Sequence, residues 1–367
     1  MDFEKRKTKL VRNLAKKGSN VDCVMITSLP NLTYYFNYAG ASYERFCAGL
    51  ISMKEGKSSL VVPKLDEGKT TKSVVDGVFP WTDSEGYGQA LEKALASIGG
   101  RSRNVGCEDW TTLYSMESVK KVRTGAKFQS ISPSISDQRL IKDEEEIQAL
   151  RLASGILSKG YEKLPEILKA GKSEIEAGFE MKKTLTDLGA SEVGFLAIQS
   201  GPNSSVPHSQ TSQKKLSDGD MVVVDIGCTS ESGYNADFTR TFCVGRPSEE
   251  QRKVYGVVQE AQSTGVKSAV PNKPAKNVDR DVRKIIQDAG FGEFFVHRTG
   301  HGLGLEVHEP PWISSLNPSK IKPGMAFTVE PGIYIPGKFG VRIEDNVVAN
   351  SSGNENLTQV THELIEV

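Results

Sequence analysis

The apolar positions of the first third of the chain form short runs separated by helical patterns. Runs of this length, bounded by turn residues, are typical of strands. The predicted strands are 21–27, 50–53, 59–62 and 105–108, and the predicted helices are 90–98 and 112–121. Glu55-Gly56 is placed to turn the second strand into the third as a hairpin. Strands that alternate with helices in this way predict a small α/β domain.

Strong helix starts follow a serine-rich segment at 130–134. Asp143, Ser173 and Ser248 are each followed three residues later by Glu or Gln. This spacing is the sequence pattern of a capping box, in which two side chains satisfy backbone N–H groups at a helix start. A fourth helix is predicted from Val278 to a stop at Ala289-Gly290. We therefore place the domain boundary at this serine-rich segment, giving domains at 1–134 and 135–367.

Apolar strands lie between and after the helices of the second domain. The predicted strands are 221–226, 238–244, 326–330, 341–344, 346–349 and 363–367. The first two can form a hairpin that turns through Gly233. Pairs of helices laid over a curved, mainly antiparallel sheet would account for this order of elements. The chain as a whole is thus predicted to be α+β.

Acidic residues at the ends of apolar strands are the first chemical anomaly. Asp225, Glu330 and Glu344 each end an apolar run. A single carboxylate at a strand end is usually an exposed turn residue or a helix cap. A buried carboxylate without a partner costs several kcal/mol or takes up a proton. Arg342 alone cannot neutralise three of them, so the set predicts bound metal ions.

The distribution of histidine is the second anomaly. Three of the five histidines, His297, His301 and His308, fall within twelve positions, and three glycines are interleaved with them. Glycine lets a backbone approach a ligand closely and leaves room around an imidazole ring. One histidine here would more often be structural, whereas three in a glycine-rich segment indicate a site.

Composition narrows the range of partners. The 367 residues contain 46 Lys and Arg against 46 Asp and Glu, so no net field attracts nucleic acid or a membrane surface. No apolar run approaches the roughly 20 residues that span a bilayer, and the charged N-terminus lacks the apolar stretch of a signal peptide. Five widely spaced cysteines without a C-x-x-C pair indicate reduced thiols. We therefore expect a cytoplasmic protein.

Taken together, these segments resemble the pita-bread metallopeptidases, the family of prolidase, aminopeptidase P and methionine aminopeptidase. The resemblance covers roughly residues 135–367. The segments that carry it are 139–147, Gly201-Pro202-Asn203 with Pro207-His208, Asp225-Ile226-Gly227, 233–241, Gly300-His301-Gly302 with His308-Glu309, Glu330-Pro331-Gly332 and Arg342-Ile343-Glu344-Asp345. More loosely, the N-terminal domain is similar to the creatinase-type domain that precedes the catalytic domain of prolidases and aminopeptidase P.

The resemblance implies a set of metal ligands. By it, two divalent ions (Mn, Co or Zn) are expected on Asp225, Asp237, His301, Glu330 and Glu344. Asp237 and Glu344 would bridge the ions, Asp225 would belong mainly to one, and His301 and Glu330 to the other. Four carboxylates and one imidazole form a mostly hard donor set that suits these metals better than copper.

The resemblance also implies roles for the neighbouring side chains. His208 and His308 would hydrogen-bond the scissile carbonyl or its oxyanion, and Glu330 would carry the proton from water to the leaving amine. Arg342 would hold Asp225 in position. His297 would shape the substrate pocket. At Trp312, prolidases commonly have an Arg that binds the dipeptide's carboxylate, so a Trp here weakens a strict dipeptidase interpretation; its ring can stack on proline or line a longer peptide's path.

The implied activity is hydrolysis of the bond before proline, in dipeptides or at the N-terminus of longer peptides, by a homodimer whose partners are short proline-containing peptides. A non-catalytic binding protein with the same fold is the alternative. The presence of all five ligands disfavours that alternative and also creatinase. The interval of twelve from Asp225 to Asp237 is one longer than is usual in the family. We expect the polar stretch 229–232 to absorb the extra residue in a turn.

Overall fold

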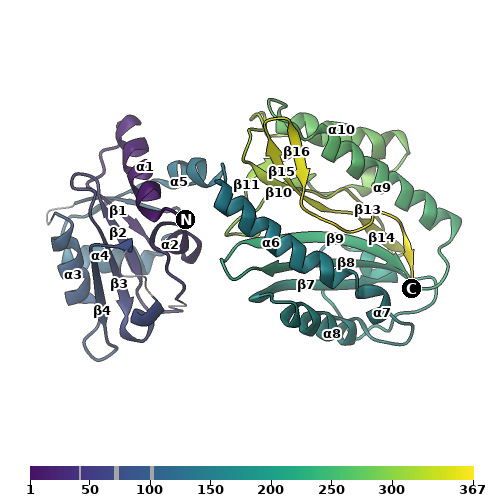
Figure 1. Cartoon of the computed structure of the whole chain (residues 1–367), viewed down its shortest axis with the longest axis horizontal. Coiled ribbons are helices and arrows are strands. Elements are labelled where there is room, and N and C mark those ends of the chain that lie inside the picture. The colour runs from purple at the N-terminus through teal and green to yellow at the C-terminus, as the bar shows by residue number, and fades with distance from the viewer. Residues whose placement is uncertain (41–42, 70–73, 100–102) are drawn as a thin grey trace. The chain divides into compact units, whose positions relative to one another are not determined.

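In the computed structural model the chain forms two compact units, residues 1–138 and 139–367. The structure describes residues 1–40, 43–69, 74–99 and 103–367. Figure 1 shows a helix-flanked sheet in the first unit and a larger assembly of strands and helices in the second. Within the described ranges, no helix is long and apolar enough to cross a membrane.

The first unit is built on a six-stranded mixed sheet with the order β4-β3-β2-β1-β5-β6. Its strands are β1 (Cys23–Ile26), β2 (Ala48–Ser52), β3 (Ser58–Pro63), β4 (Gly77–Trp81), β5 (Asn104–Cys107) and β6 (Lys127–Ser130). Its helices are α1 (Phe3–Lys16), α2 (Leu29–Phe36), η1 (Lys64–Lys69), α3 (Gly88–Ser97) and α4 (Leu113–Val122), and α5 (Ser132–Arg139) ends at the boundary.

The hairpin predicted in this unit is confirmed. Strands β2 and β3 pair antiparallel, with Ile51 opposite Ser58. In contrast, β1 pairs parallel with β5, and β5 with β6, across the intervening helices. The buried face of α3, which includes Leu91 and Leu95, packs against this sheet in one apolar core. An independent core of this kind makes the unit an α/β domain, as the alternating pattern indicated.

Capping boxes open three helices of the second unit, as predicted. The side chains of Asp143, Ser173 and Ser248 each accept a hydrogen bond from the backbone N–H of the residue three positions later. The side chain of that later residue accepts a hydrogen bond from the backbone N–H of the capping residue. The helices of this unit are α6 (Glu144–Tyr161), α7 (Leu164–Ile167), α8 (Glu174–Asp187), η3 (Gly201–Ser205), α9 (Glu249–Ser268), α10 (Ala275–Asp288) and η4 (Gly292–Phe294).

The strands of the second unit form a four-stranded sheet with the order β17-β9-β8-β7, a five-stranded sheet with the order β11-β10-β12-β15-β16, and the pair β13-β14. Their bounds are β7 (Glu192–Ser200), β8 (Met221–Thr229), β9 (Asn235–Cys243), β10 (Gly300–Gly302), β11 (Glu309–Ile313), β12 (Ala326–Val329), β13 (Gly332–Ile335), β14 (Phe339–Arg342), β15 (Asp345–Asn350), β16 (Gly353–Asn356) and β17 (Ile365–Glu366). Apart from the parallel pair β17–β9, these strands pair antiparallel.

Helices cover these sheets in two groups (Figure 1). Residues of α6 and α8, among them Leu157 and Met181, share an apolar core with β8 and β9. Residues of α9 and α10, among them Val258 and Val282, share another with β13 and β14. The predicted α+β architecture, with helices over curved, mainly antiparallel sheets, is confirmed.

The hairpin of β8 and β9 positions the two predicted aspartate ligands. Asp225 pairs with Thr239, and Gly227 pairs with Asp237, in one unbroken antiparallel register. Alternate residues of a strand share a face, and directly opposite residues share it too. Asp225 and Asp237 therefore point to the same side of the sheet. The strands end at Thr229 and resume at Asn235, so the polar residues between them form the turn without disturbing this register.

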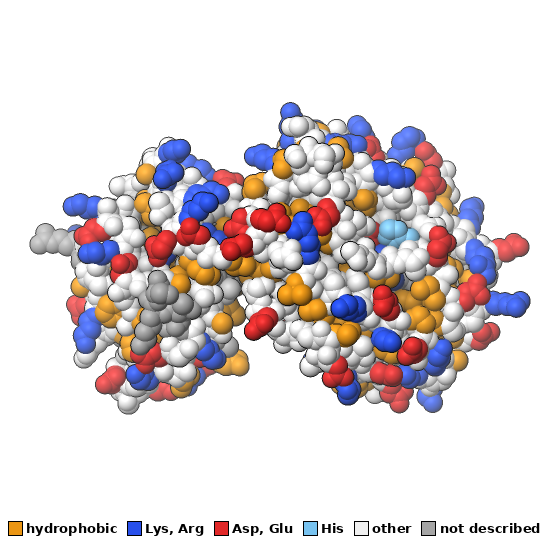
Figure 2. Space-filling view, in the orientation of Figure 1, with side chains coloured by type: hydrophobic (Ala, Val, Ile, Leu, Met, Phe, Trp, Pro, Cys, Tyr) orange, Lys and Arg blue, Asp and Glu red, His pale blue; other side chains and the backbone are white. Residues whose placement is uncertain are grey.

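Charges of both signs are interspersed over the face of the molecule drawn in Figure 2. This distribution matches the equal numbers of acidic and basic residues in the chain. A mixed surface of this kind creates no broad field of a single sign.

Candidate metal centre

A cavity of about 650 Å³ in the second unit collects nearly all of the predicted site residues. Those on its wall are Asp225, Asp237, His301, Glu330, Glu344, His208, His297, His308 and Arg342. Trp312 does not line the cavity itself. Its ring instead lies beneath the guanidinium of Arg298, which does line it, with 4.3 Å between the Arg298 Cζ and the ring centroid.

Three overlapping groups of side chains in this cavity have the spacing of metal ligands. Within each group the candidate ligand atoms all lie within 4.8 Å of one another. The groups are Asp225 with Asp237 and Glu344, His301 with Glu330 and Glu344, and Asp237 with His301 and His308. Because Asp237, His301 and Glu344 each belong to two groups, the five predicted ligands form one continuous cluster.

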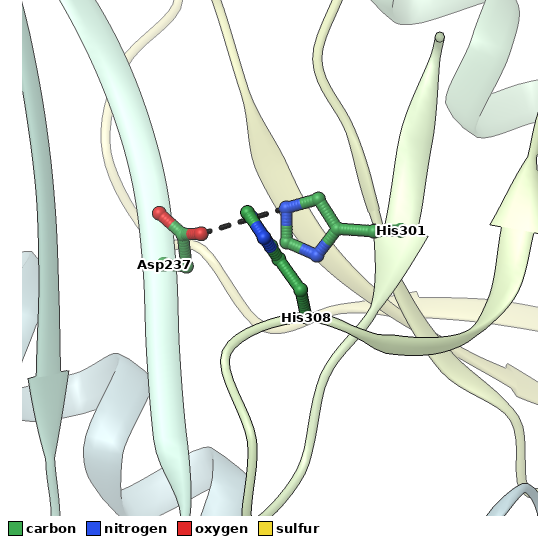
Figure 3. Close-up of side chains that lie close together, drawn as sticks. All are labelled: Asp237, His301 and His308. Carbon is green, nitrogen blue, oxygen red and sulfur yellow. Dashed lines mark ion pairs between the residues drawn. The ribbon is translucent and has the colours of Figure 1, made fainter. Parts of the chain in front are cut away.

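His301 presents one ring nitrogen to this cluster. Its Nδ1 lies 3.1 Å from the Gly302 carbonyl oxygen, which fixes the ring and makes Nδ1 the donor. Its Nε2 lies 3.6 Å from Asp237 Oδ2 and 3.4 Å from Glu330 Oε1. Figure 3 shows the Asp237 contact and the His308 ring beside His301. A histidine held through one nitrogen with the other turned to carboxylates has the usual arrangement of a metal ligand.

Neighbouring donors hold the carboxylates in place. Arg342 is buried and donates to Asp225, to the Tyr334 hydroxyl at 2.8 Å and to Thr239 Oγ1 at 3.0 Å. The Thr239 hydroxyl in turn donates to Glu344 Oε2 at 2.7 Å. Arg342 thus connects two of the acids by one direct contact and one relayed contact.

The electrostatics show an excess of buried negative charge. Burial, followed by repulsion from Asp225, raises the pKa of Asp237 well above its usual range. Burial and the Asp237 charge do the same to the pKa of Glu344. In addition, Asp225 Oδ1 and Asp237 Oδ1 are buried without a hydrogen-bond partner. Buried acceptors of this kind need a cation or a proton.

These observations fit divalent metal ions. The donor set is rich in oxygen, its acids lack enough protein cations, and its unpartnered oxygens lie within the ligand groups. His301 also suits a metal, because burial lowers its pKa to about 4 and keeps the imidazole neutral at neutral pH. A neutral imidazole is the form that binds metal.

The other histidines lie around the cluster. His308 has its ring 4.0 Å from that of His301, and burial together with this neighbour lowers its pKa to about 4. His297 lies 2.9 Å from the Tyr334 hydroxyl and 2.8 Å from the Arg298 carbonyl oxygen, and burial lowers its pKa. His208 is exposed on the cavity wall.

The glycines near His301 have a different role from the one expected. A Cβ atom at Gly300 would overlap the Thr328 carbonyl, and one at Gly302 would overlap the Pro310 carbonyl. Both glycines belong to β10, which lies between β11 and β12. They therefore make room for the neighbouring strands rather than for the imidazole ring.

Sequence reasoning missed several residues of the site. Tyr334, Thr239, Arg298 and Gln199 either line the cavity or orient its side chains. Only Arg298 carried a signal, because it directly follows His297. The others are ordinary strand residues whose partners become adjacent only on folding.

Comparison with known proteins places this carboxylate–histidine cluster in a class of metallopeptidases. Residues 148–351 match metallopeptidase family M24, and residues 6–141 match the creatinase/prolidase N-terminal domain. The chain is 36% identical to an Xaa-Pro dipeptidase of Pyrococcus horikoshii over 368 residues, with all of both chains covered. It therefore belongs to metallopeptidase family M24.

Solved structures agree over the full length. A prolidase from Thermococcus sibiricus superimposes with a TM-score of 0.92 at 36% identity, with 100% of both chains covered. An Xaa-Pro dipeptidase from Bacillus anthracis superimposes with a TM-score of 0.89 at 31% identity, also with complete coverage. The resemblance seen in the sequence is thereby confirmed for the family and the fold.

Proposed function

We propose that this chain is a metal-dependent peptidase that hydrolyses the Xaa-Pro bond, with dipeptides as its main substrates. The observation that carries the proposal is the cluster of four carboxylates and His301 on one cavity, with His208 and His308 on the same wall. Full-length relatives named Xaa-Pro dipeptidase support this choice of substrate.

Two divalent ions, Mn, Co or Zn, would be held by Asp225, Asp237, His301, Glu330 and Glu344. The charge excess of the cluster and its unpartnered oxygens support this assignment. When bound, such ions polarise a carbonyl and make water a nucleophile at neutral pH. Arg342 keeps Asp225 oriented through its direct contact and Glu344 through Thr239.

The remaining side chains would move protons and stabilise charge. His308 is neutral at neutral pH because its pKa is about 4, so one ring nitrogen carries a proton that it can donate to the oxyanion. His208 would donate to the same carbonyl group from its own segment of the cavity wall. Glu330 would accept the proton of the attacking water and pass it to the leaving amine.

Arg298 supports the preference for dipeptides. The family resemblance leads us to expect an Arg where this chain has Trp312, but the Arg298 guanidinium stacks on that ring and lines the cavity. Among the described residues it has no carboxylate partner within ion-pair distance. We therefore assign it to the substrate's terminal carboxylate, with the Trp312 ring orienting it.

Assembly and compartment belong to the same proposal. We keep the homodimer as the expected assembly, to be tested by light scattering. Cys47, Cys107, Cys228 and Cys243 are buried free thiols, which supports a reducing, cytoplasmic setting.

Cleavage assays on metal-loaded protein test the function. Ala-Pro should be hydrolysed, whereas Ala-Pro-amide and a longer Ala-Pro peptide should be poor substrates because they lack the carboxylate at the expected place. Preferential cleavage of the longer peptide would instead indicate an aminopeptidase. Binding of these peptides without cleavage, under loading with each of the three metals, would leave the non-catalytic binding protein as the answer.

A further inference from the structure

The position of His208 depends on its backbone. His208 lies between η3 and β8 on the cavity wall, and its side chain is exposed. Across the described ranges of the chain, no hydrogen bond or ion pair holds its ring. The position of this imidazole therefore depends on the contacts that hold the backbone of residues 200–212.

A single carboxylate ties both ends of that segment. Glu174, in the first turn of α8, is fully buried. Its Oε1 accepts from Ser200 N at 2.7 Å, from Ser200 Oγ at 2.8 Å and from Asn203 Nδ2 at 3.1 Å. Its Oε2 accepts from Ser212 N at 2.9 Å, from Ser212 Oγ at 2.7 Å and from Asn203 Nδ2 at 3.2 Å. Six hydrogen bonds thus converge on one side chain.

The backbone reinforces this tie. The amide N–H groups of Glu174 and Ile175 donate to the carbonyls of Lys214 and Ser212, at 3.0 and 3.1 Å. The second residue of the segment is Gly201, where φ is +51° and a Cβ atom would overlap the Asp220 carboxylate. Asn203 follows and reaches Glu174. The Gly-Pro-Asn motif therefore shapes the start of the His208 segment and links it to α8.

We propose that Glu174 is a positioning residue that acts on catalysis through His208. Its carboxylate accepts neutral donors from Ser200 and Asn203 before His208 and from Ser212 after it. Bonds from several donors to one buried acceptor fix a geometry more firmly than a single contact does. The inference rests on the proposed function, because it assigns Glu174 a part in placing a substrate-contacting histidine.

The matched pair of variants is Glu174→Gln and Glu176→Gln. The amide that Glu174→Gln introduces would face backbone and hydroxyl donors, so about half of the hydrogen bonds would be lost although the side chain keeps its shape. Glu176 is on the same helix, but it is exposed, and the one described residue that donates hydrogen bonds to its carboxylate is Ser173. We expect kcat/KM for Ala-Pro to fall about tenfold or more for Glu174→Gln, with kcat carrying most of the loss. Metal content should stay as in wild type, and Glu176→Gln should retain wild-type kinetics.

A double-mutant cycle separates positioning from general destabilisation. In a His208→Ala background, Glu174→Gln should cost little further activity, because the group that it positions is already gone. An additive loss would overturn the proposal. If Glu174→Gln does not fold, Ser212→Ala takes its place in the same cycle, since it removes one donor to Glu174 and should give a smaller loss in the same direction.

Hydrogen exchange gives a readout that does not depend on activity. Amides of residues 200–212 should exchange faster in Glu174→Gln than in wild type or Glu176→Gln. Unchanged exchange there would contradict the tie. If wild-type protein cleaves no Xaa-Pro substrate, the proposed function fails, while faster exchange in Glu174→Gln would still uphold the role of Glu174 in ordering the segment.

Discussion

Glu344 and Asp345 are neighbours in the chain, and both are buried, yet they belong to two different regions of the second unit. Glu344 faces the cavity, where the one side-chain hydrogen bond that it receives from the described residues comes from Thr239. Asp345, the first residue of β15, lies in a separate polar cluster. The side chains of Arg240, Gln262, Asn356 and His362 all contact its carboxylate there.

The two regions have opposite effects on acidity. The pKa of Glu344 is raised by burial and by the charge of Asp237. The pKa of Asp345 is lowered, because Arg240 and His362 outweigh the effect of burial. Burial alone therefore does not identify a metal ligand. The informative feature is a buried acid whose surroundings lack enough donors to hold its charge.

The largest effect should come from removing an acid on the cavity side. Asp237→Ala or Glu344→Ala should abolish binding of both ions and lower kcat/KM by more than about 100-fold, because each of these residues belongs to two of the ligand groups. Metal analysis and kinetics on purified protein check this. Glu355→Ala, which removes an acid paired with Arg151 outside the cavity, should keep both ions. Full activity in metal-free Asp237→Ala would contradict the mechanism.

The free energy of unfolding of the metal-free protein should change in opposite directions when Glu344 and Asp345 are replaced. Asp345→Asn leaves Arg240 buried with a weaker partner and should lower the free energy of unfolding by roughly 3–5 kcal/mol. Glu344→Gln removes a buried charge that is repelled by neighbouring acids and has Thr239 as its one described hydrogen-bond donor, and it should raise this free energy by about 1 kcal/mol. Urea unfolding at neutral pH measures both changes. Destabilisation of the metal-free protein by Glu344→Gln would mean that its carboxylate is satisfied by the protein alone.

The changes in unfolding free energy caused by Glu344→Gln and Asp345→Asn should also depend on pH, because one native pKa is raised and the other is lowered. Glu344 has a raised native pKa, so the advantage of Glu344→Gln is full above that pKa and shrinks as pH falls towards about 4.3. Asp345 has a lowered native pKa, so the penalty of Asp345→Asn persists down to about pH 3.9 and is lost only below it. Urea series at several pH values, compared with wild type, test the two signs.

The smallest effect is expected at the rim of the cavity. Trp312→Ala removes the ring beneath Arg298 and should raise KM for Ala-Pro about two- to fivefold, with kcat and metal content unchanged. Trp312→Phe, which keeps an aromatic face, should lie between this variant and wild type. A larger loss in kcat than in KM for Trp312→Ala would place this side chain closer to the chemistry than the structure does.

Local signals account for the parts of the fold that were predicted. Capping boxes, the β2–β3 hairpin and the apolar strand β8 depend on residues near one another in sequence. The pattern of apolar and polar residues therefore predicts them. Strand β7 was missed because none of the residues in its first half is buried. The short strands β10 and β11 were missed because glycine and proline dominate them.

The site divides in the same way. The sequence marked Asp225, Glu330 and Glu344 because acids stand out at the ends of apolar strands. It marked His297, His301 and His308 by their clustering among glycines. The family resemblance added Asp237 and His208. The residues that hold these side chains in place could not be recognised in the sequence. Thr239 and Tyr334 look like ordinary strand residues, and Glu174 looks like a favourable charge in the first turn of a helix. Its partners Ser200 and Ser212 lie 26 and 38 positions away, so only folding reveals the contact.

Strand β10 also has a consequence for interpreting mutational scans. Any side chain at Gly300 or Gly302 must push against a backbone carbonyl of an adjoining strand, so even alanine should displace His301, which stands between them. An activity screen would score both glycines as if they took part in the reaction, although neither has a functional group to contribute. Abundance or thermal-melting data, collected beside activity, would tell such false positives apart from true participants.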